Sequence, residues 1–218
     1  MSSVMVITVD GPVAAGKGLL SWRLAEHFGL NHLDSGMIYR ATAARLLDQG
    51  DDPTDEAAAA FAAESLEISD LQRSDLRLQS VGQAASVIAA LPSVRAALLR
   101  MQRRFAAKPP GAVIDGRDIG TVVCPDADVK LFVTAGLDVR AKRRFDELVG
   151  RGQSPVLAEI TAEIAERDKR DMERETAPLR QAEDAILLDT SELDADQALV
   201  AALKIVEQQL KAPAKTSI

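Results

Sequence analysis

Near the amino terminus, a glycine-rich turn separates a short apolar run from a helical pattern. The apolar run covers residues 4–9, Asp10 follows it, and the turn then reads Gly11-Pro12-Val13-Ala14-Ala15-Gly16-Lys17. The glycines let the backbone turn tightly, so that successive N–H groups point at phosphate oxygens. A helix that begins at the end of the turn adds its positive end, and Lys17 adds a cation. This order of elements predicts a loop that binds nucleotide phosphates.

The residues after the lysine depart from the usual pattern. A serine or threonine hydroxyl normally follows the lysine and helps to hold Mg²⁺, but this chain has Gly18 and Leu19, and Ser21 lies one helical turn too far along. The alternative interpretation is a glycine-rich surface turn with a solvated lysine. The strand before the turn and the helix after it favour the phosphate loop. We therefore expect residues 11–19 to bind ATP, with any Mg²⁺ relying on phosphate oxygens, water and other residues.

Bulk properties exclude several classes of function. The 218 residues suit one domain spanning 1–218, with 47% hydrophobic residues for its core. Only 3% are aromatic and the net charge is −7, which argues against binding of nucleic acid polymers or acidic membranes. No apolar run approaches the length of a membrane span, and a single cysteine excludes an internal disulfide. We expect a cytoplasmic monomer.

Apolar runs alternate with helical patterns along the chain. Strands are expected at 4–9, 112–115, 129–134 and 185–189, with a fifth near 31–33, and helices at 17–28, 37–47, 93–105, 137–148, 158–174 and 194–210. This alternation predicts an α/β fold with a parallel sheet covered by helices on both faces. Ligands should bind at the carboxyl ends of the strands, where the sequence places Asp10, Asp34, Asp115 and Asp189.

The middle of the chain is less regular. Residues 57–60 fit an alanine-rich helix, whereas 66–68 and 76–78 alternate apolar and polar residues and predict a small β-hairpin. Several other side chains are assigned structural roles. Trp22 and Phe28 are expected in the core, Cys124 as a small hydrophobe, and His27 and His32 as surface or hydrogen-bonded residues.

A charged segment places four residues on one helical face: Arg167, Arg170, Asp171 and Arg174. A solvated helix with internal salt bridges is the alternative explanation. Because phosphoryl transfer needs cations on the transferring group, the phosphate loop favours Arg167 and Arg174 as phosphate ligands.

Two further segments end strands with polar residues. Asp115-Gly116-Arg117-Asp118 places Asp115 where a carboxylate orders Mg²⁺-bound water, with Arg117 and Asp118 over the site. A turn with a local ion pair is the alternative. In the second segment, Asp34 and Ser35 predict a helix N-cap. Arg40, one turn inside that helix, could reach an acceptor phosphate.

Taken in order, these motifs resemble the bacterial cytidylate kinases, a family of nucleoside monophosphate kinases. The resemblance extends nearly end to end and includes Leu33-Asp34-Ser35-Gly36, Ile38-Tyr39-Arg40, Asp115-Gly116-Arg117-Asp118, Glu166-Arg167-Asp168, Arg170-Asp171 and Ala177-Pro178-Leu179. It implies a parallel-sheet core with a monophosphate-binding insert at about 60–92 and a mobile lid at about 150–176. The implied reaction transfers the γ-phosphoryl group of ATP to CMP or dCMP, with Mg²⁺.

The resemblance also implies roles for individual residues. Lys17 would neutralise the transferring group, Arg167, Arg170 and Arg174 would serve the lid and that phosphate, and the acceptor would contact Ser35, Arg40, Ser86, Arg95, Arg117, Asp118 and Asp171. Among these, Ser86, Arg95 and Asp118 would face cytosine, Arg40 and Arg117 the acceptor phosphate, and Asp171 the ribose.

The chain departs from the family pattern in two places. Members usually carry threonine where this chain has Leu19, and the insert is shorter than in the longer bacterial members. Two alternatives therefore stay open. One is another small-molecule P-loop kinase, acting on UMP or a metabolite hydroxyl. The other is a nucleotide-binding protein that has lost catalysis.

Overall fold

The computed structural model describes residues 4–211, and its centre is one sheet of five parallel strands in the order β2-β3-β1-β4-β5. The strands are β1 (Met5–Asp10), β2 (Asn31–Asp34), β3 (Gly111–Gly116), β4 (Val129–Thr134) and β5 (Ile186–Asp189). The central strand β1 pairs in parallel with both β3 and β4. The predicted parallel α/β architecture is confirmed, and the carboxyl ends of all five strands lie on one edge.

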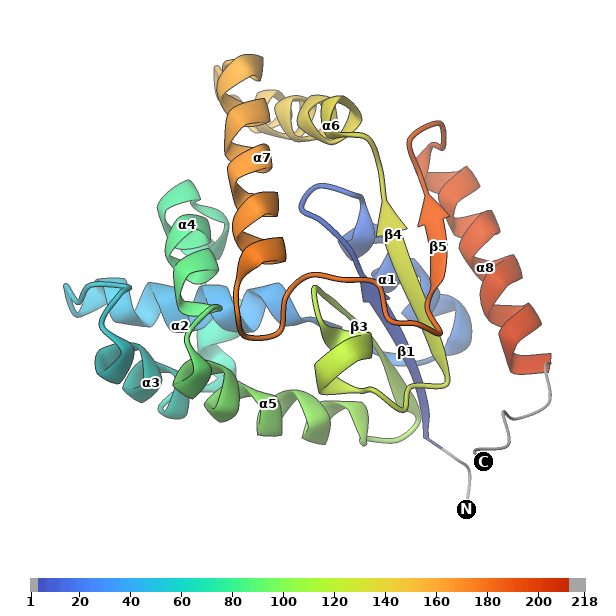
Figure 1. Cartoon of the computed structure of the whole chain (residues 1–218), viewed down its shortest axis with the longest axis horizontal. Coiled ribbons are helices and arrows are strands. Elements are labelled where there is room, and N and C mark those ends of the chain that lie inside the picture. The colour runs from blue at the N-terminus through green and yellow to red at the C-terminus, as the bar shows by residue number, and fades with distance from the viewer. Residues whose placement is uncertain (1–3, 212–218) are drawn as a thin grey trace.

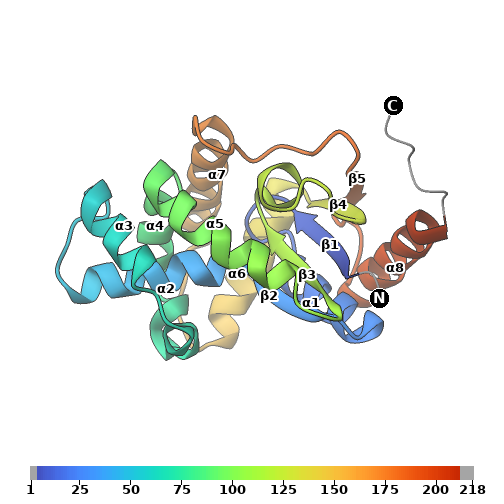
Figure 2. The same cartoon turned by 90° about the horizontal axis from the view of Figure 1, so that it is seen from below.

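Helices cover both faces of the sheet (Figures 1 and 2). On one face, α1 (Lys17–Phe28) and α8 (Ala195–Lys211) share an apolar core with Ile7 and Val9. On the other face, α5 (Pro92–Ala106) and a single π-helical turn, η3 (Ile119–Val123), pack with Val6. Because strand side chains alternate between faces, the even-numbered residues of β1 point toward η3.

A helical insert separates β2 from β3. Its elements are α2 (Ser35–Asp48), α3 (Glu56–Glu64), the 3₁₀ turns η1 (Ile68–Gln72) and η2 (Ser74–Arg77), and α4 (Gln79–Ile88). The predicted alanine-rich helix is confirmed as α3, but the predicted β-hairpin is wrong. Leu66, Leu71 and Leu76 pack into the helical core of the insert. Alternation over only three residues is too short to define a strand, and packing within the insert orders these leucines instead.

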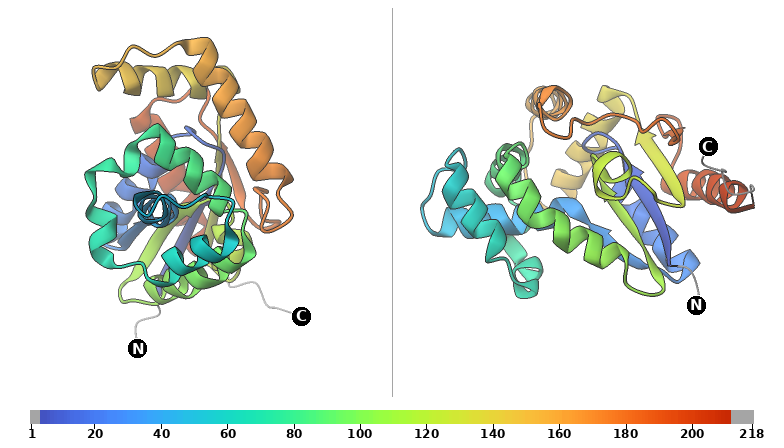
Figure 3. Two further views of the ribbon diagram at one scale, coloured as in Figure 1. Left: turned by 90° about the vertical axis from the view of Figure 1, so that its left-hand side faces the viewer. Right: turned by 60° about the horizontal axis from the view of Figure 1, so that its bottom comes forward.

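Two long helices, α6 (Leu137–Gly150) and α7 (Leu157–Glu173), connect β4 to β5 and project beyond the carboxyl ends of the strands (Figures 1 and 3). They pack on each other through Ala141, Ile160 and Ile164. The Gln79 amide of α4 donates a hydrogen bond to Glu163 of α7. We call α6 and α7 the lid helices, because α7 reaches from the sheet to the insert.

The small structural assignments have mixed outcomes. Phe28 and Cys124 are partly buried against apolar clusters, as expected. Trp22 is 51% exposed, so its expected place in the core is wrong. No single helix of residues 4–211 is long and apolar enough to cross a membrane. Only together do α4 and α5 have the length and apolar composition of a membrane span, and the chain bends by 100° between them.

Candidate active site

The loop between β1 and α1 has the geometry of a phosphate cradle. A side chain at Gly11 would collide with β4, because its Cβ would lie 1.9 Å from the Val133 carbonyl oxygen. Gly16 adopts a left-handed φ of 87° at the start of α1. The Lys17 ammonium donates to the Pro12 carbonyl at 2.6 Å. The loop therefore folds back around the lysine amine.

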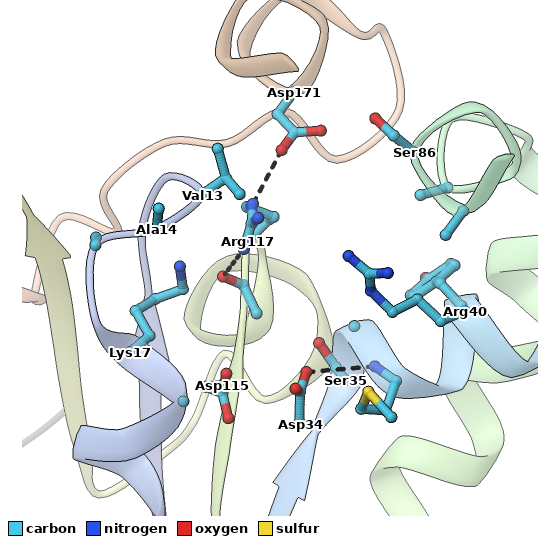
Figure 4. Close-up of a pocket in the computed structure, with 18 of the residues that line it drawn as sticks. Val13, Ala14, Lys17, Asp34, Ser35, Arg40, Ser86, Asp115, Arg117 and Asp171 are labelled. Carbon is cyan, nitrogen blue, oxygen red and sulfur yellow. Dashed lines mark hydrogen bonds and ion pairs between the residues drawn. The ribbon is translucent and has the colours of Figure 1, made fainter. Parts of the chain in front are cut away.

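Above this loop lies a cavity of about 810 Å³, bounded by the sheet edge, the insert and the lid helices (Figure 4). Within residues 4–211, seven cationic side chains line it, including Lys17, Arg40, Arg117 and Arg167, which come from four different segments. Burial, together with the charge of Arg117, lowers the pKa of Lys17, and the same two causes lower the pKa of Arg167 to about 10. Among the described residues, the buried Nε of Arg167 has no hydrogen-bond partner. This excess of positive charge suits a polyanion.

Arg117 joins the turn after β3 to the lid. Its Nε donates to the Asp171 carboxylate at 2.9 Å (Figure 4). Burial acts to raise the pKa of Asp171, but the charges of Arg117 and Arg167 outweigh it and hold the pKa below its ordinary value. Asp171 is therefore a charged acceptor at the cavity wall.

The far end of the cavity gathers the residues assigned to a base. The buried Asp118 carboxylate accepts hydrogen bonds from Arg95 and, at 3.5 Å, from Arg174. The hydroxyl oxygen of Ser86 is buried with no partner among the described residues. We call this cluster of Ser86, Arg95, Asp118 and Arg174 the base end. The structure thus pairs Arg174 with Asp118.

A pair of carboxylates lies near the loop on neighbouring strands. Asp34 caps α2 by accepting from the Met37 N–H at 3.3 Å, which confirms the expected N-cap, and Ser35 begins the helix in a buried position. Burial and the charge of Asp115 raise the pKa of Asp34. His32 Nε2 lies 3.0 Å from the Asp115 carboxylate.

Asp34 and Asp115 are suited to binding a cation together with phosphate oxygens. They place negative charge next to the phosphate loop, and the charge of each carboxylate acts to raise the pKa of Lys17. Within residues 4–211 no group of three or more His, Cys, Asp or Glu side chains could hold a metal ion. The donor set therefore suits Mg²⁺ bound mainly through phosphate oxygens and water, with Asp115 as an outer ligand.

Some predicted residues lie outside the cavity. Arg170 points to the surface, where it forms an ion pair with Glu166 at 2.8 Å, and it does not line the cavity. Asp10 is buried beneath the site and faces η3. Asp189 binds the Ser191 N–H in the loop after β5.

The sequence analysis missed a second, smaller cavity of about 290 Å³, which shares the wall formed by Ala15, Gly16 and Leu19. Arg143 of α6 lines it and donates to the carbonyl oxygens of Thr190 and Leu193. Arg140 and Arg143 lie on adjacent turns of one helix face, which was the only signal available. Arg77 of η2 also lines the larger cavity and was missed, because its segment was assigned to a hairpin.

A parallel sheet with a glycine-rich phosphate loop, a helical insert and two lid helices around one cationic cavity defines the class: a P-loop kinase of small phosphorylated substrates. Comparisons with known proteins identify the family. The sequence model of the family described as Cytidylate kinase matches residues 7–208. The chain therefore belongs to the cytidylate kinase family, which supports CMP kinase function.

Relatives agree with this family assignment. A protein of Methylocella silvestris named cytidylate kinase is 56% identical over 203 residues, which are 93% of this chain and 94% of that protein. Another of that name, from Brucella suis biovar 1, is 52% identical over 205 residues, covering 94% of each chain. The crystal structure of an uncharacterized Eubacterium ventriosum protein has a TM-score of 0.55 at 14% identity and covers 93% of this chain and 98% of that one, which shows the fold alone. Nothing in these comparisons favours a metabolite kinase or a binding protein without catalysis.

Proposed function

We propose that this protein transfers the γ-phosphoryl group of ATP to CMP or dCMP. The observation that carries the proposal is the convergence of Lys17, Arg40, Arg117 and Arg167 on one cavity whose far end presents a carboxylate, a guanidinium and a free hydroxyl. The donor γ-phosphate and the acceptor phosphate repel each other, so bringing them together needs such a cationic centre. Recognition of a specific acceptor base needs polar groups of fixed orientation.

The donor would occupy both cavities. Its nucleoside would lie in the smaller one beside Arg143, with the triphosphate following residues 11–19 toward Lys17. Mg²⁺ would be held by phosphate oxygens, with Asp115 and Asp34 as its nearest carboxylates, and would neutralise charge on the transferring group.

The acceptor would lie between the insert and the turn after β3. Arg40 and Arg117 would bind its phosphate, while Asp171 on the lid would accept from a ribose hydroxyl. At the base end, Asp118 would accept from the amino group of cytosine, and Arg95 and Ser86 would donate to its ring acceptors. Uracil reverses two of these polarities, so a carboxylate would face a carbonyl oxygen.

Catalysis would consist of positioning and charge stabilisation. The acceptor is already a phosphate oxyanion, so no general base is required. Lys17 and Arg167 would neutralise the transferring group, and Arg167 would arrive with the lid. Closure of α7 over the cavity would exclude water, which otherwise competes as an acceptor. Arg170, which faces solvent, would act only on the lid surface.

A coupled assay of ADP release with CMP, dCMP, UMP and AMP tests the proposal. We expect kcat/KM for CMP to exceed that for UMP at least about tenfold, since one mispaired buried polar group costs about 1–3 kcal/mol. Equal rates with UMP would contradict the base assignment, and no ADP release with any monophosphate would contradict the activity. A monomer in the cytoplasm stays a prediction; gel filtration with light scattering tests the first part.

A further inference from the structure

Asp10 is a buried carboxylate that the proposed reaction does not use. It is the last residue of the central strand β1 and directly precedes Gly11 of the phosphate loop, and it is only 4% exposed. Both of its oxygens are occupied: Oδ1 accepts from the Ile119 N–H at 2.8 Å and Oδ2 from the Gly120 N–H at 2.7 Å. These N–H groups begin the π-helical turn η3, whose preceding residue is Asp118.

The backbone after Asp118 is thus bound to the strand before the phosphate loop. Asp118 makes no side-chain capping hydrogen bond to its own turn, so the cap is supplied from β1. A negative charge at the exposed N–H groups of a helical turn is stabilising. Asp118 is thereby left free to pair with Arg95 and Arg174.

Gly120 allows this close approach. A methyl group on Gly120 would lie 2.9 Å from Thr8 Oγ1, 3.2 Å from Lys130 Cδ and 3.4 Å from Asp10 Oδ2, so a larger residue would force η3 and these side chains apart. The contact between β1 and η3 therefore depends on the Asp10 carboxylate and on the absence of a side chain at Gly120.

We propose that Asp10 is a positioning residue that holds Asp118 in register with the phosphate loop, and so sets how strictly the acceptor base is read. The proposal rests on the proposed function, because it assumes that Asp118 reads the base. A carboxylate at this position is costly, since burial raises the pKa of Asp10 to about 6 against the opposing effect of the two N–H groups.

The test compares kcat/KM for CMP and UMP in wild type, Asp10→Asn, Asp118→Asn and the double variant. An asparagine oxygen accepts from one N–H, but its amide nitrogen faces the other N–H. We expect Asp10→Asn to lower the CMP:UMP ratio about threefold to tenfold, mainly through KM for CMP, with KM for ATP changed less than about twofold. If Asp10 acts through Asp118, the double variant should be no worse with CMP than Asp118→Asn alone.

Two further variants keep the test decisive. Thr8→Val is the matched control, because Thr8 lies on the same face of β1, its buried hydroxyl has no partner among the described residues, and valine has the same shape; it should leave the ratio unchanged. Gly120→Ala leaves Asp10 intact but displaces η3, and it should reproduce the reduced ratio even if Asp10→Asn fails to fold.

The possible outcomes separate the two proposals. An unchanged ratio in Asp10→Asn and in Gly120→Ala, with only a lower melting temperature, would overturn the positioning role and leave the CMP kinase proposal intact. Losses that add in the double variant would also overturn it, because Asp10 would then act independently of Asp118. If the wild-type protein shows no preference for CMP over UMP, the assignment of Asp118 to base recognition would itself be contradicted.

Discussion

The two ends of the large cavity are built in different ways. The phosphate end consists of a continuous loop, residues 11–19, joined by Arg40, Arg117 and Arg167. Arg117 is paired with Asp171, whereas the buried Nε of Arg167 has no partner among the described residues. The base end takes Ser86, Arg95, Asp118 and Arg174 from α4, α5, the turn after β3 and the end of α7, and pairs its charges internally. A polyanion needs summed charge, which several side chains can share. A base needs defined donors and acceptors, and each of those must be held by a partner.

This difference has an energetic consequence. At the phosphate end, loss of a cation leaves negative charge on the transferring phosphoryl group without a neutralising partner. At the base end, loss of a partner mainly changes orientation. We therefore expect graded effects, and the following predictions run from the largest to the smallest.

Lys17→Ala should reduce kcat by about a thousandfold or more, since this amine neutralises the transferring phosphoryl group. The fold should persist, because the hydrogen bond that the Lys17 ammonium makes among the described residues is to the Pro12 carbonyl of its own loop. Steady-state kinetics and circular dichroism provide the two readouts. Lys142→Ala, a 61% exposed lysine on α6, is the control and should be fully active. Normal turnover in Lys17→Ala would remove this residue from the mechanism.

Asp118→Asn should lower kcat/KM for CMP by about 10- to 100-fold and narrow the CMP:UMP ratio, because the amide can rotate to donate to a carbonyl oxygen. The assay is kcat/KM for CMP, dCMP and UMP. Asp126→Asn, an exposed carboxylate in the loop before β4, should change nothing. The same ratio in wild type and Asp118→Asn would mean that the base end does not read the base.

The pH dependence of the unfolding free energy measures the cost of burying a charged carboxylate at Asp10, whose neighbouring charges are Asp118 and Lys17. Its folded pKa of about 6 lies above the ordinary value of 3.8, so the folded state retains a proton that the unfolded chain loses between these values. Stability should therefore fall as pH rises from 4 to 6, by about 1.4 kcal/mol per unit of pKa difference. The unfolding free energy of Asp10→Asn minus that of wild type, from urea titrations, should rise by about 1–3 kcal/mol over this range. A constant difference would show that Asp10 titrates normally.

Leu19→Thr should have the smallest effect. Leu19 is 53% exposed and lines both cavities, so a hydroxyl there would meet the donor phosphates or their Mg²⁺. We expect an improvement of about threefold or less in KM for MgATP, worth under about 1 kcal/mol. Leu19→Val has the shape of threonine without the hydroxyl and is the matched control. Identical Mg²⁺ titrations of the two variants would show that this protein does not need the hydroxyl.

Local sequence predicted much of the core and the phosphate end. The strands and most helices are periodic over many residues, and the loop from Gly11 to Lys17 is marked by its glycines and by the short distance along the chain between Pro12 and Lys17. Asp34 likewise caps α2 through a hydrogen bond three residues away. The hairpin prediction failed because Leu66 and Leu76 are ordered by packing against α2 and not by their immediate neighbours.

Short-range periodicity and turn chemistry were enough to predict the parallel sheet, the phosphate loop and the list of charged residues available to the site. How those charges are used depends on contacts formed when the chain packs. Tertiary packing turned Arg170 to the surface, brought Arg174 to Asp118, and bound Asp10 to a turn 109 residues away. The last two contacts join elements distant in the chain, and their geometry is set by how helices pack on the sheet, which no local pattern encodes.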